Sequence, residues 1–282
     1  MRASASLAGV RVGGDQPVRL MAVLNVSPES FYPTSVRCDA VALRDAAQRA
    51  VAEGADLIDV GARSTAPYGT GAVELEEEVR RMTWAVESVV RAVRVPVSAD
   101  TTRAPVVAAA LAAGARLVND VSGLRGDAAV ADLAAQAEGV VLMAAPDGGE
   151  DAAPLVLVRR ALADSLGRAR AAGIADAEIV LDPGIGFFTG SALPATAFNL
   201  AVLRDLAALA DFGRPLLIGV SRKRFVAELT GRANVDERLP GSLAATAIAV
   251  HHGAAIIRTH DVAATRDAVR VAEALRGRGS DE

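Results

Sequence analysis

The chain has 282 residues, of which 51% are hydrophobic, and its formal net charge is −4. This length and apolar content can bury a sizeable core, while the mildly acidic balance gives no reason to expect nucleic acid or a membrane surface as the main partner. The single cysteine, Cys38, excludes an internal disulfide framework and a cysteine-based zinc site. We therefore expect small-molecule substrates and a cytoplasmic location.

Eight short apolar runs alternate with longer amphipathic stretches from residue 20 onward, a pattern typical of βα units around a parallel sheet. None of these segments has the roughly 18 uncharged apolar residues of a membrane span. The predicted strands are 20–26, 57–62, 95–100, 116–120, 139–145, 178–184, 214–220 and 254–260. The predicted helices are 42–54, 74–93, 104–114, 128–138, 154–173, 197–210, 241–252 and 262–276, several of which end at a glycine.

Eight βα units in a chain of this length favour a (β/α)8 TIM barrel. A doubly wound open sheet is the alternative, because eight parallel strands can also lie flat with helices on both faces, and the strand count leaves both open. Residues 1–19 predict a short hairpin or tail that would close the bottom of a barrel. Since no linker divides the rest of the chain, we expect one domain over 20–276 and a C-terminal tail at 277–282.

Most of the predicted strands end in polar side chains, and in a barrel these ends converge on one mouth. Each such residue alone has an ordinary explanation, as a surface group or as the cap of the next helix. Acidic and amide groups nevertheless collect on strands three, four and six, as Asp100, Asn119 and Asp182. Such groups accept hydrogen bonds in defined directions, so they could recognise a flat heterocycle that carries amino and ring N–H groups.

Cationic groups collect on the last two strands, which favours an anion on that side of the mouth. Arg258 offers a planar fork of donors, and His260, two residues on, points to the same side, so the two could bind phosphate. Asn25 on the first strand would be their neighbour in a closed barrel and could hold Mg²⁺ together with a diphosphate. No HxH, HExxH or CxxC spacing occurs, so we expect no permanently bound transition metal.

Lys223 is the only lysine in the chain, directly after the predicted strand 214–220. One interpretation is a surface cation between Arg222 and Arg224, the usual meaning of such a triplet. The other is a compact donor that bonds a carbonyl or ring nitrogen where a guanidinium would be too bulky. A Schiff-base role has less support, because no acid–base partner lies nearby in the sequence.

Eight motifs, in order, resemble those of the dihydropteroate synthase family over nearly the whole chain. They are LNVSPESF (24–31), DVGARSTAP (59–67), SADT (98–101), NDVSG (119–123), LDPGIGF (181–187), GVSRKRF (219–225), GSLAA (241–245) and RTHDV (258–262). The resemblance implies a TIM barrel and a transferase of folate synthesis. That reaction condenses 6-hydroxymethyl-7,8-dihydropterin diphosphate with p-aminobenzoate, giving 7,8-dihydropteroate and pyrophosphate.

The resemblance also implies a role for each matching residue. The pterin ring would be held by Asp100, Asn119, Asp182 and Lys223. The diphosphate would be held by Asn25, Thr65, Arg258 and His260, with Asn25 also binding Mg²⁺. The aminobenzoate would lie near Thr65, Pro67, Phe187, Ser221 and Arg222.

The implied mechanism is dissociative: diphosphate leaves first, and the arylamine attacks the cationic pterin methylene that remains. The catalytic residues would be Asp100, Lys223, Arg258 and His260, because they lie where the two opposite charges develop. Members of the family commonly form homodimers.

The chain departs from the family mainly in the loops beside the second substrate. Phe31 is followed by YPTS in place of SDGG, and the usual ESTRPG reads RSTAPY, so that Arg63 replaces a glutamate and Ala66 an arginine. In the fifth strand Met143-Ala144 replaces MH, and GIGFFTG lacks the lysine that follows GIGFG in the family. These departures leave three alternatives: an active synthase with altered sulfonamide sensitivity, a pterin-dependent methyltransferase, and a catalytically silent paralogue. Arg63 could substitute for the arginine missing at position 66.

Overall fold

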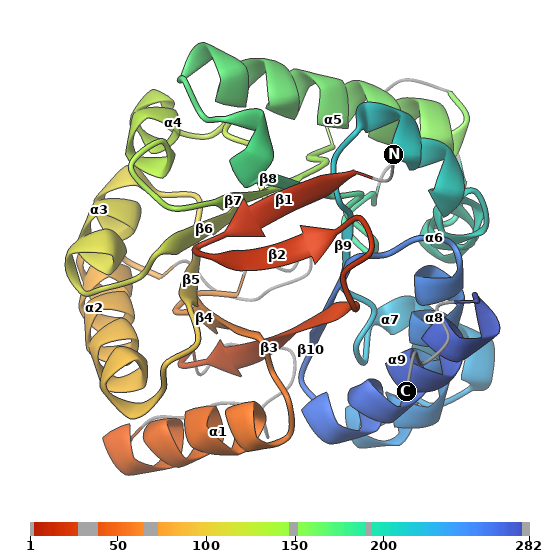
Figure 1. The fold of residues 1–282 in the computed structure, drawn as a ribbon, viewed down its shortest axis with the longest axis horizontal. Helices are drawn as coiled ribbons and strands as arrows, with labels where there is room; N and C mark the ends of the chain where they lie inside the picture. The colour runs from red at the N-terminus through yellow and green to blue at the C-terminus, as the bar shows by residue number, and fades with distance from the viewer. Residues whose placement is uncertain (1–2, 28–38, 65–72, 147–151, 190–192, 278–282) are drawn as a thin grey trace.

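A two-stranded hairpin precedes a barrel in the computed structural model, which describes residues 3–27, 39–64, 73–146, 152–189 and 193–277. The hairpin pairs β1 (Ser4–Leu7) with β2 (Val10–Gly13) in antiparallel register. Figure 1 shows it crossing one end of the barrel, with the helices around the outside. The sequence predicted a short hairpin or a tail in this place.

Eight parallel strands form the barrel wall in the order β8-β7-β6-β5-β4-β3-β10-β9. Their bounds are β3 (Arg19–Asn25), β4 (Leu57–Gly61), β5 (Val97–Asp100), β6 (Leu117–Asp120), β7 (Val140–Met143), β8 (Ile179–Asp182), β9 (Leu217–Ile218) and β10 (Ile256–Thr259). The ring closes between β8 and β9, where Leu181 bridges to Leu216 and its N–H donates to the Pro215 carbonyl at 3.0 Å. This closure confirms the predicted TIM barrel and excludes the open sheet.

Helices cover the outside of the wall. They are α1 (Ala40–Ala52), α2 (Leu75–Ala92), α3 (Ala104–Ala112), α4 (Ala128–Ala134), α5 (Pro154–Ala171), α6 (Ala195–Arg204), α7 (Arg224–Thr230), α8 (Leu239–His251) and α9 (Val262–Leu275). Short 3₁₀ turns are η2 (Asp176–Glu178), η3 (Leu206–Phe212) and η4 (Val235–Arg238). Within the described part of the chain, no helix is long and apolar enough to cross a membrane.

Two helices differ from the sequence prediction. The predicted helix 197–210 is divided at Asp205, whose ψ of 16° is not helical, into α6 and the 3₁₀ turn η3. The helix α7, which begins directly after Lys223, was not predicted. Its seven residues end at Gly231 in the left-handed region, with φ of 69°, so the segment is too short to show a helical hydrophobic period.

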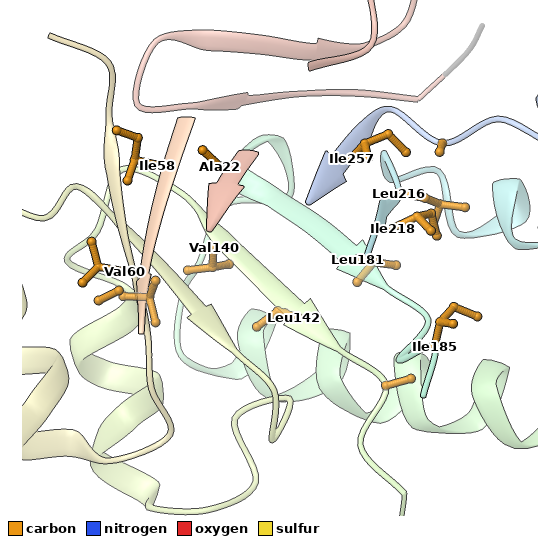
Figure 2. Close-up of a cluster of buried hydrophobic side chains, with 14 of the residues drawn as sticks. Ala22, Ile58, Val60, Val140, Leu142, Leu181, Ile185, Leu216, Ile218 and Ile257 are labelled. Carbon is orange, nitrogen blue, oxygen red and sulfur yellow. The ribbon is translucent and has the colours of Figure 1, made fainter. Parts of the chain in front are cut away.

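Outward-facing strand residues form the main core between the barrel and the helices. Figure 2 shows part of this layer, in which Ile58 and Val60 of β4, Val140 and Leu142 of β7, and Leu181 of β8 are all buried. Full burial of each such side chain contributes roughly 1.5–3 kcal/mol. Because strand side chains alternate, the residues between these positions face the inside of the barrel.

A second apolar layer closes the barrel from within at the hairpin end. Leu7 and Val12 of the hairpin are fully buried there. They pack with one inward-facing residue from each of seven strands, namely Met21, Leu57, Leu117, Val141, Val180, Leu217 and Ile256. We call this the bottom layer.

Candidate active site

Polar side chains lie two residues beyond the bottom layer on four of its strands. Leu57 is followed at this spacing by Asp59, Leu117 by Asn119, Val180 by Asp182 and Ile256 by Arg258. Since strand side chains alternate, each polar residue faces the interior above its apolar partner. We call these four residues, together with Asp100 at the end of β5, the polar layer.

Arg258 connects the polar layer. Its Nε donates to Asp59 Oδ2 at 2.7 Å and its Nη2 to Asp100 Oδ2 at 2.8 Å. Asp59 Oδ2 also accepts from Asn119 Nδ2 at 2.9 Å. The structure therefore brings three of the predicted site residues together and adds Asp59, which the sequence interpretation did not single out. Its signal was an acidic residue within an otherwise apolar buried strand, on the same face as Leu57.

Asp100 has an unsatisfied acceptor. The residue is 6% exposed, and its Oδ1 has no hydrogen-bond partner among the described residues. Burial raises the pKa of Asp100 to about 7, against the opposing charge of Arg258 and with a further increase from Asp59. A buried acceptor of this kind is costly without a donor, so a ligand N–H would stabilise it.

Lys223 turns into the barrel. Its ammonium donates to the Ile185 carbonyl and lies 5.0 Å from the centroid of the Phe187 ring. A Cβ at Gly186 would come within 3.1 Å of Lys223 Cδ, so glycine there gives the lysine stem its room. Burial lowers the pKa of Lys223 to about 8, against the opposing charge of Asp182. Lys223 is thus an inward donor and not the alternative surface cation.

Asp182 is the carboxylate whose negative charge raises the pKa of Lys223 most. Its Oδ1 accepts from the Gly184 N–H at 2.8 Å, in the turn after β8. Burial raises the pKa of Asp182, while the charge of Lys223 and the bond from Gly184 oppose that shift. The β8 end of the mouth therefore offers a fixed acceptor beside a fixed cation.

Asn25 lies beside Asp100 at the end of β3. A Cβ on Gly61 would be 3.0 Å from Asn25 Oδ1 and 4.0 Å from Asp100 Oδ2, so both oxygens border the same glycine. β3 pairs with β10, as predicted, which places Asn25 on the same side as Arg258. Among the described residues, no group of three or more His, Cys, Asp or Glu side chains is arranged to hold a metal ion.

His260 and Ser221 are joined at the ends of β10 and β9. His260 Nδ1 lies 3.1 Å from Ser221 Oγ, and the His260 N–H donates to the same oxygen at 3.3 Å. Burial and the positive charges of Arg258, Arg222 and Lys223 lower the pKa of His260 to about 3. The imidazole is therefore neutral near pH 7.

The Arg222 guanidinium forms hydrogen bonds with other residues of the protein. Its guanidinium donates twice to Asp261, at 2.8 and 2.6 Å, and to the carbonyls of Val235 and Asp236, each at 2.9 Å. Its backbone has φ of 55°, an uncommon conformation for a residue other than glycine. The side chain thus fixes the segment that carries Ser221 and Lys223.

Arg63 also has internal partners. Its Nε donates to Glu78 Oε2 at 2.9 Å and its Nη2 to Thr102 Oγ1 at 3.2 Å. Glu78 is fully buried and forms a second ion pair with Arg103 at 3.1 Å. Two arginines therefore flank one buried carboxylate where the second loop begins. The predicted site residues Thr65 and Pro67, and the substituted Ala66, lie outside the described residues.

Known proteins are similar to this chain in both sequence and fold. The model of the family described as "Pterin binding enzyme" matches residues 21–260. Dihydropteroate synthase of Neisseria meningitidis serogroup B is 40% identical over 94% of this chain and 94% of its own length. A solved dihydropteroate synthase of Xanthomonas albilineans with 4-aminobenzoic acid has a TM-score of 0.85 and 39% identity, over 98% of this chain and 99% of that chain.

A relative described as inactive also matches. Inactive dihydropteroate synthase 2 of Mycobacterium tuberculosis is 36% identical over 96% of this chain and 87% of its own length. Family membership and turnover are therefore separate questions for this sequence. The match over most of the chain, the barrel and the polar layer all lead to one family: the chain belongs to the pterin binding enzymes and, among them, to the dihydropteroate synthases.

Proposed function

We propose that this protein condenses 6-hydroxymethyl-7,8-dihydropterin diphosphate with p-aminobenzoate, giving 7,8-dihydropteroate and pyrophosphate. The observation that supports this proposal is the polar layer, in which Asp100 Oδ1, a buried acceptor that no described residue bonds, lies beside the Arg258 cation at the mouth of the barrel. A flat heterocycle with N–H donors and an anionic substituent matches that pattern of charges.

The pterin ring would be recognised by Asp100, Asn119, Asp182 and Lys223. The carboxylates and the amide oxygen accept from ring N–H and amino groups, and Lys223 donates to a ring carbonyl or nitrogen. All four side chains are held by internal contacts before a ligand arrives. Such preorganisation lowers the entropic cost of binding.

The diphosphate would lie over Arg258, His260 and Asn25. Within the described part of the chain Arg258 bonds Asp59 through Nε and Asp100 through Nη2, so Nη1 would be the donor that meets an anion. The donor set suits Mg²⁺ held mainly by substrate, since Asn25 offers one hard oxygen and the diphosphate would offer others. Mg²⁺ bound there would neutralise part of the charge that develops on the leaving diphosphate. Thr65 stays a predicted diphosphate ligand.

Bond cleavage would be helped by charges on both sides of the breaking bond. Arg258 stabilises the departing anion, and the Asp100 carboxylate stabilises the cationic pterin methylene that is left behind. The arylamine nitrogen then attacks that carbon and loses a proton. No covalent bond to the protein is required.

The aminobenzoate would bind beside Phe187 and Ser221, near the pterin carbon that it attacks. Phe187 already contacts the Lys223 ammonium, so a ring placed against it would be close to the pterin. Arg222 would contribute by holding the backbone of this segment, because its guanidinium is bonded to Asp261. Thr65 and Pro67 stay predicted contacts, and the homodimer and the cytoplasmic location likewise stay predictions.

The proposal is tested by pyrophosphate release from the purified protein with the pterin diphosphate, p-aminobenzoate and Mg²⁺, with the product identified by mass. We expect release that depends on p-aminobenzoate. Pterin binding without turnover would instead identify a silent paralogue, in line with the inactive relative and with Ala66. Absence of pterin binding would contradict the site assignment as well.

A further inference from the structure

A carboxylate lies beneath the proposed pterin site, out of reach of any ligand. Asp59 is fully buried in β4, between Leu57 of the bottom layer and Gly61 at the mouth. Asp59 is the first residue of the motif DVGARSTAP, but none of the proposed binding or catalytic roles is assigned to it. A buried ionised group is expensive, so its presence needs an explanation.

Stability alone does not explain Asp59. A buried ion pair often contributes no more than apolar residues of the same size would, because both charges lose their hydration. Asp59 Oδ1 has no hydrogen-bond partner within the described part of the chain, which adds to the cost. The role of Asp59 therefore lies in its effect on the side chains that it bonds.

Both partners of Asp59 belong to the polar layer, and it orients each of them. Asp59 Oδ2 accepts from Asn119 Nδ2 at 2.9 Å, and a carboxylate paired with arginine can only accept. The amide nitrogen of Asn119 is thus held on the side of Asp59, away from the mouth of the barrel. The Asn119 Oδ1 is therefore the atom available to a ligand. Asp59 also accepts from Nε of Arg258 at 2.7 Å, and Asp100 accepts from Nη2, so Nη1 is the guanidinium nitrogen that the described residues leave for an anion.

We propose that Asp59 is a positioning residue that sets the hydrogen-bond pattern of the site: it makes Asn119 an acceptor towards the ring and aims Arg258 at the leaving group. This inference rests on the proposed function, because it assumes a ring that offers N–H donors. Asp59 would thereby contribute to the preference for a ring with N–H donors, because without it the Asn119 amide could rotate and present its own N–H groups to the ligand.

The test compares two rings that differ at one substituent. We would measure binding of 6-hydroxymethylpterin and of 6-hydroxymethyllumazine, in which an oxo group replaces the ring amino group, by calorimetry. Asp59→Asn should weaken pterin binding about tenfold, because the Asn119 amide oxygen is no longer held towards the ring and its hydrogen bond to the ligand is lost. It should also reduce the preference for pterin over lumazine by about tenfold, because the freed amide can donate to the oxo group.

Ser98→Ala is the matched control. Ser98 lies opposite Asp59 in the β4–β5 register, is fully buried, and has an Oγ without a partner among the described residues. We expect this variant to keep the wild-type ring preference. If Asp59→Asn weakens both rings by the same factor, or weakens neither, the positioning role is wrong. If the wild-type protein binds neither ring, the proposed function fails instead.

A second measurement needs no substitution, and so holds if Asp59→Asn does not fold. The side-chain amide of Asn119 can be followed by NMR in the wild-type protein with and without 6-hydroxymethylpterin. The proton bonded to Asp59 should stay protected from solvent exchange in both states, with little change in chemical shift. A large shift or loss of protection on binding would show that the ligand takes the amide N–H, which would overturn the proposal.

Discussion

The two inner layers of the barrel differ sharply although they lie on the same strands, two residues apart. Inward-facing residues of the bottom layer are apolar and packed against the hairpin, whereas those of the polar layer are charged or amide groups, of which Asp59 and Asp100 are bonded to Arg258. Burial makes the first layer stabilising and the second costly. The hairpin end of the barrel therefore contributes stability, and the opposite end provides the groups for ligand binding and catalysis.

This difference predicts that substitutions in the two layers have separable effects. Changes in the bottom layer should alter the free energy of unfolding and leave ligand binding intact. Changes in the polar layer should alter ligand binding. Stability should stay nearly unchanged where no ion pair is broken, as in Asn119→Ala, whereas loss of one partner of the buried Asp59–Arg258–Asp100 pairs should also destabilise the fold.

The largest expected effect is on stability, from Leu7→Ala in the hairpin. Leu7 is fully buried in the bottom layer, so its truncation should lower the free energy of unfolding by about 2–5 kcal/mol. Denaturant unfolding measures the loss, and KM for both substrates should stay at the wild-type value. A variant that loses pterin affinity along with stability would contradict the separation of the layers.

Lys223→Ala should weaken ligand binding and leave the free energy of unfolding nearly unchanged, the reverse of Leu7→Ala. Loss of a charged hydrogen bond to the pterin should weaken binding by about 1.5–3 kcal/mol, or roughly tenfold to a hundredfold, with little change in unfolding. Calorimetry with the pterin checks this. Arg224→Ala is the control, because that neighbouring side chain is 68% exposed and pairs with Glu228 on its own helix. Equal affinity in wild type and Lys223→Ala would refute the placement of the ring.

The next largest effect should be the change in pterin affinity with pH. The pKa of Asp100 is raised to about 7, so its proton is bound below that value and the acceptor carboxylate predominates above it. Affinity for 6-hydroxymethylpterin should therefore fall as the pH falls below about 7, approaching tenfold per pH unit. His260 stays neutral over this range, since its pKa is lowered to about 3.

Asp100→Asn provides the control for that titration, because an amide cannot take up the proton. Its pterin binding should be weaker and should show no acidic decline between about pH 5 and about pH 7. An acidic decline that persists in this variant would assign the titration to another group.

The smallest expected effect concerns the substituted second loop. The Arg63 guanidinium is bonded to Glu78 and Thr102, so we expect that it does not replace the arginine missing at position 66. Ala66→Arg should then raise kcat/KM for the pterin diphosphate a few-fold, on the order of 1 kcal/mol for one added ionic contact. Pyrophosphate release measures the gain. An unchanged rate would indicate that Arg63 already makes the contact with the anion.

The sequence located most of the fold because alternation and turn residues are local signals. The predicted strands begin or end within a few residues of the observed ones, although β9 has only two residues where seven were predicted. Closure of the barrel is a long-range property. It depends on the pairing of Leu181 with Leu216, which no local pattern encodes. The count of βα units favoured a barrel, but only the resemblance to a family decided against the open sheet.

Prediction of the site was limited in a similar way. Residues at strand ends, such as Asp100 and Arg258, could be selected because their neighbours are apolar. Asp59 was not predicted as a site residue because it lies within a strand and not at its end, although its spacing from Leu57 placed it on the inner face. The partners of Arg63 and Arg222 could not be predicted, since Glu78 and Asp261 come from other elements of the barrel.

The most direct test of the two-layer account uses two residues of one strand. Leu117 belongs to the bottom layer and Asn119 to the polar layer of β6. We would measure the free energy of unfolding and the Kd for 6-hydroxymethylpterin in Leu117→Ala and Asn119→Ala. The account predicts that Leu117→Ala loses stability with unchanged Kd and that Asn119→Ala raises Kd with nearly unchanged stability. Parallel changes in both quantities in both variants would contradict it.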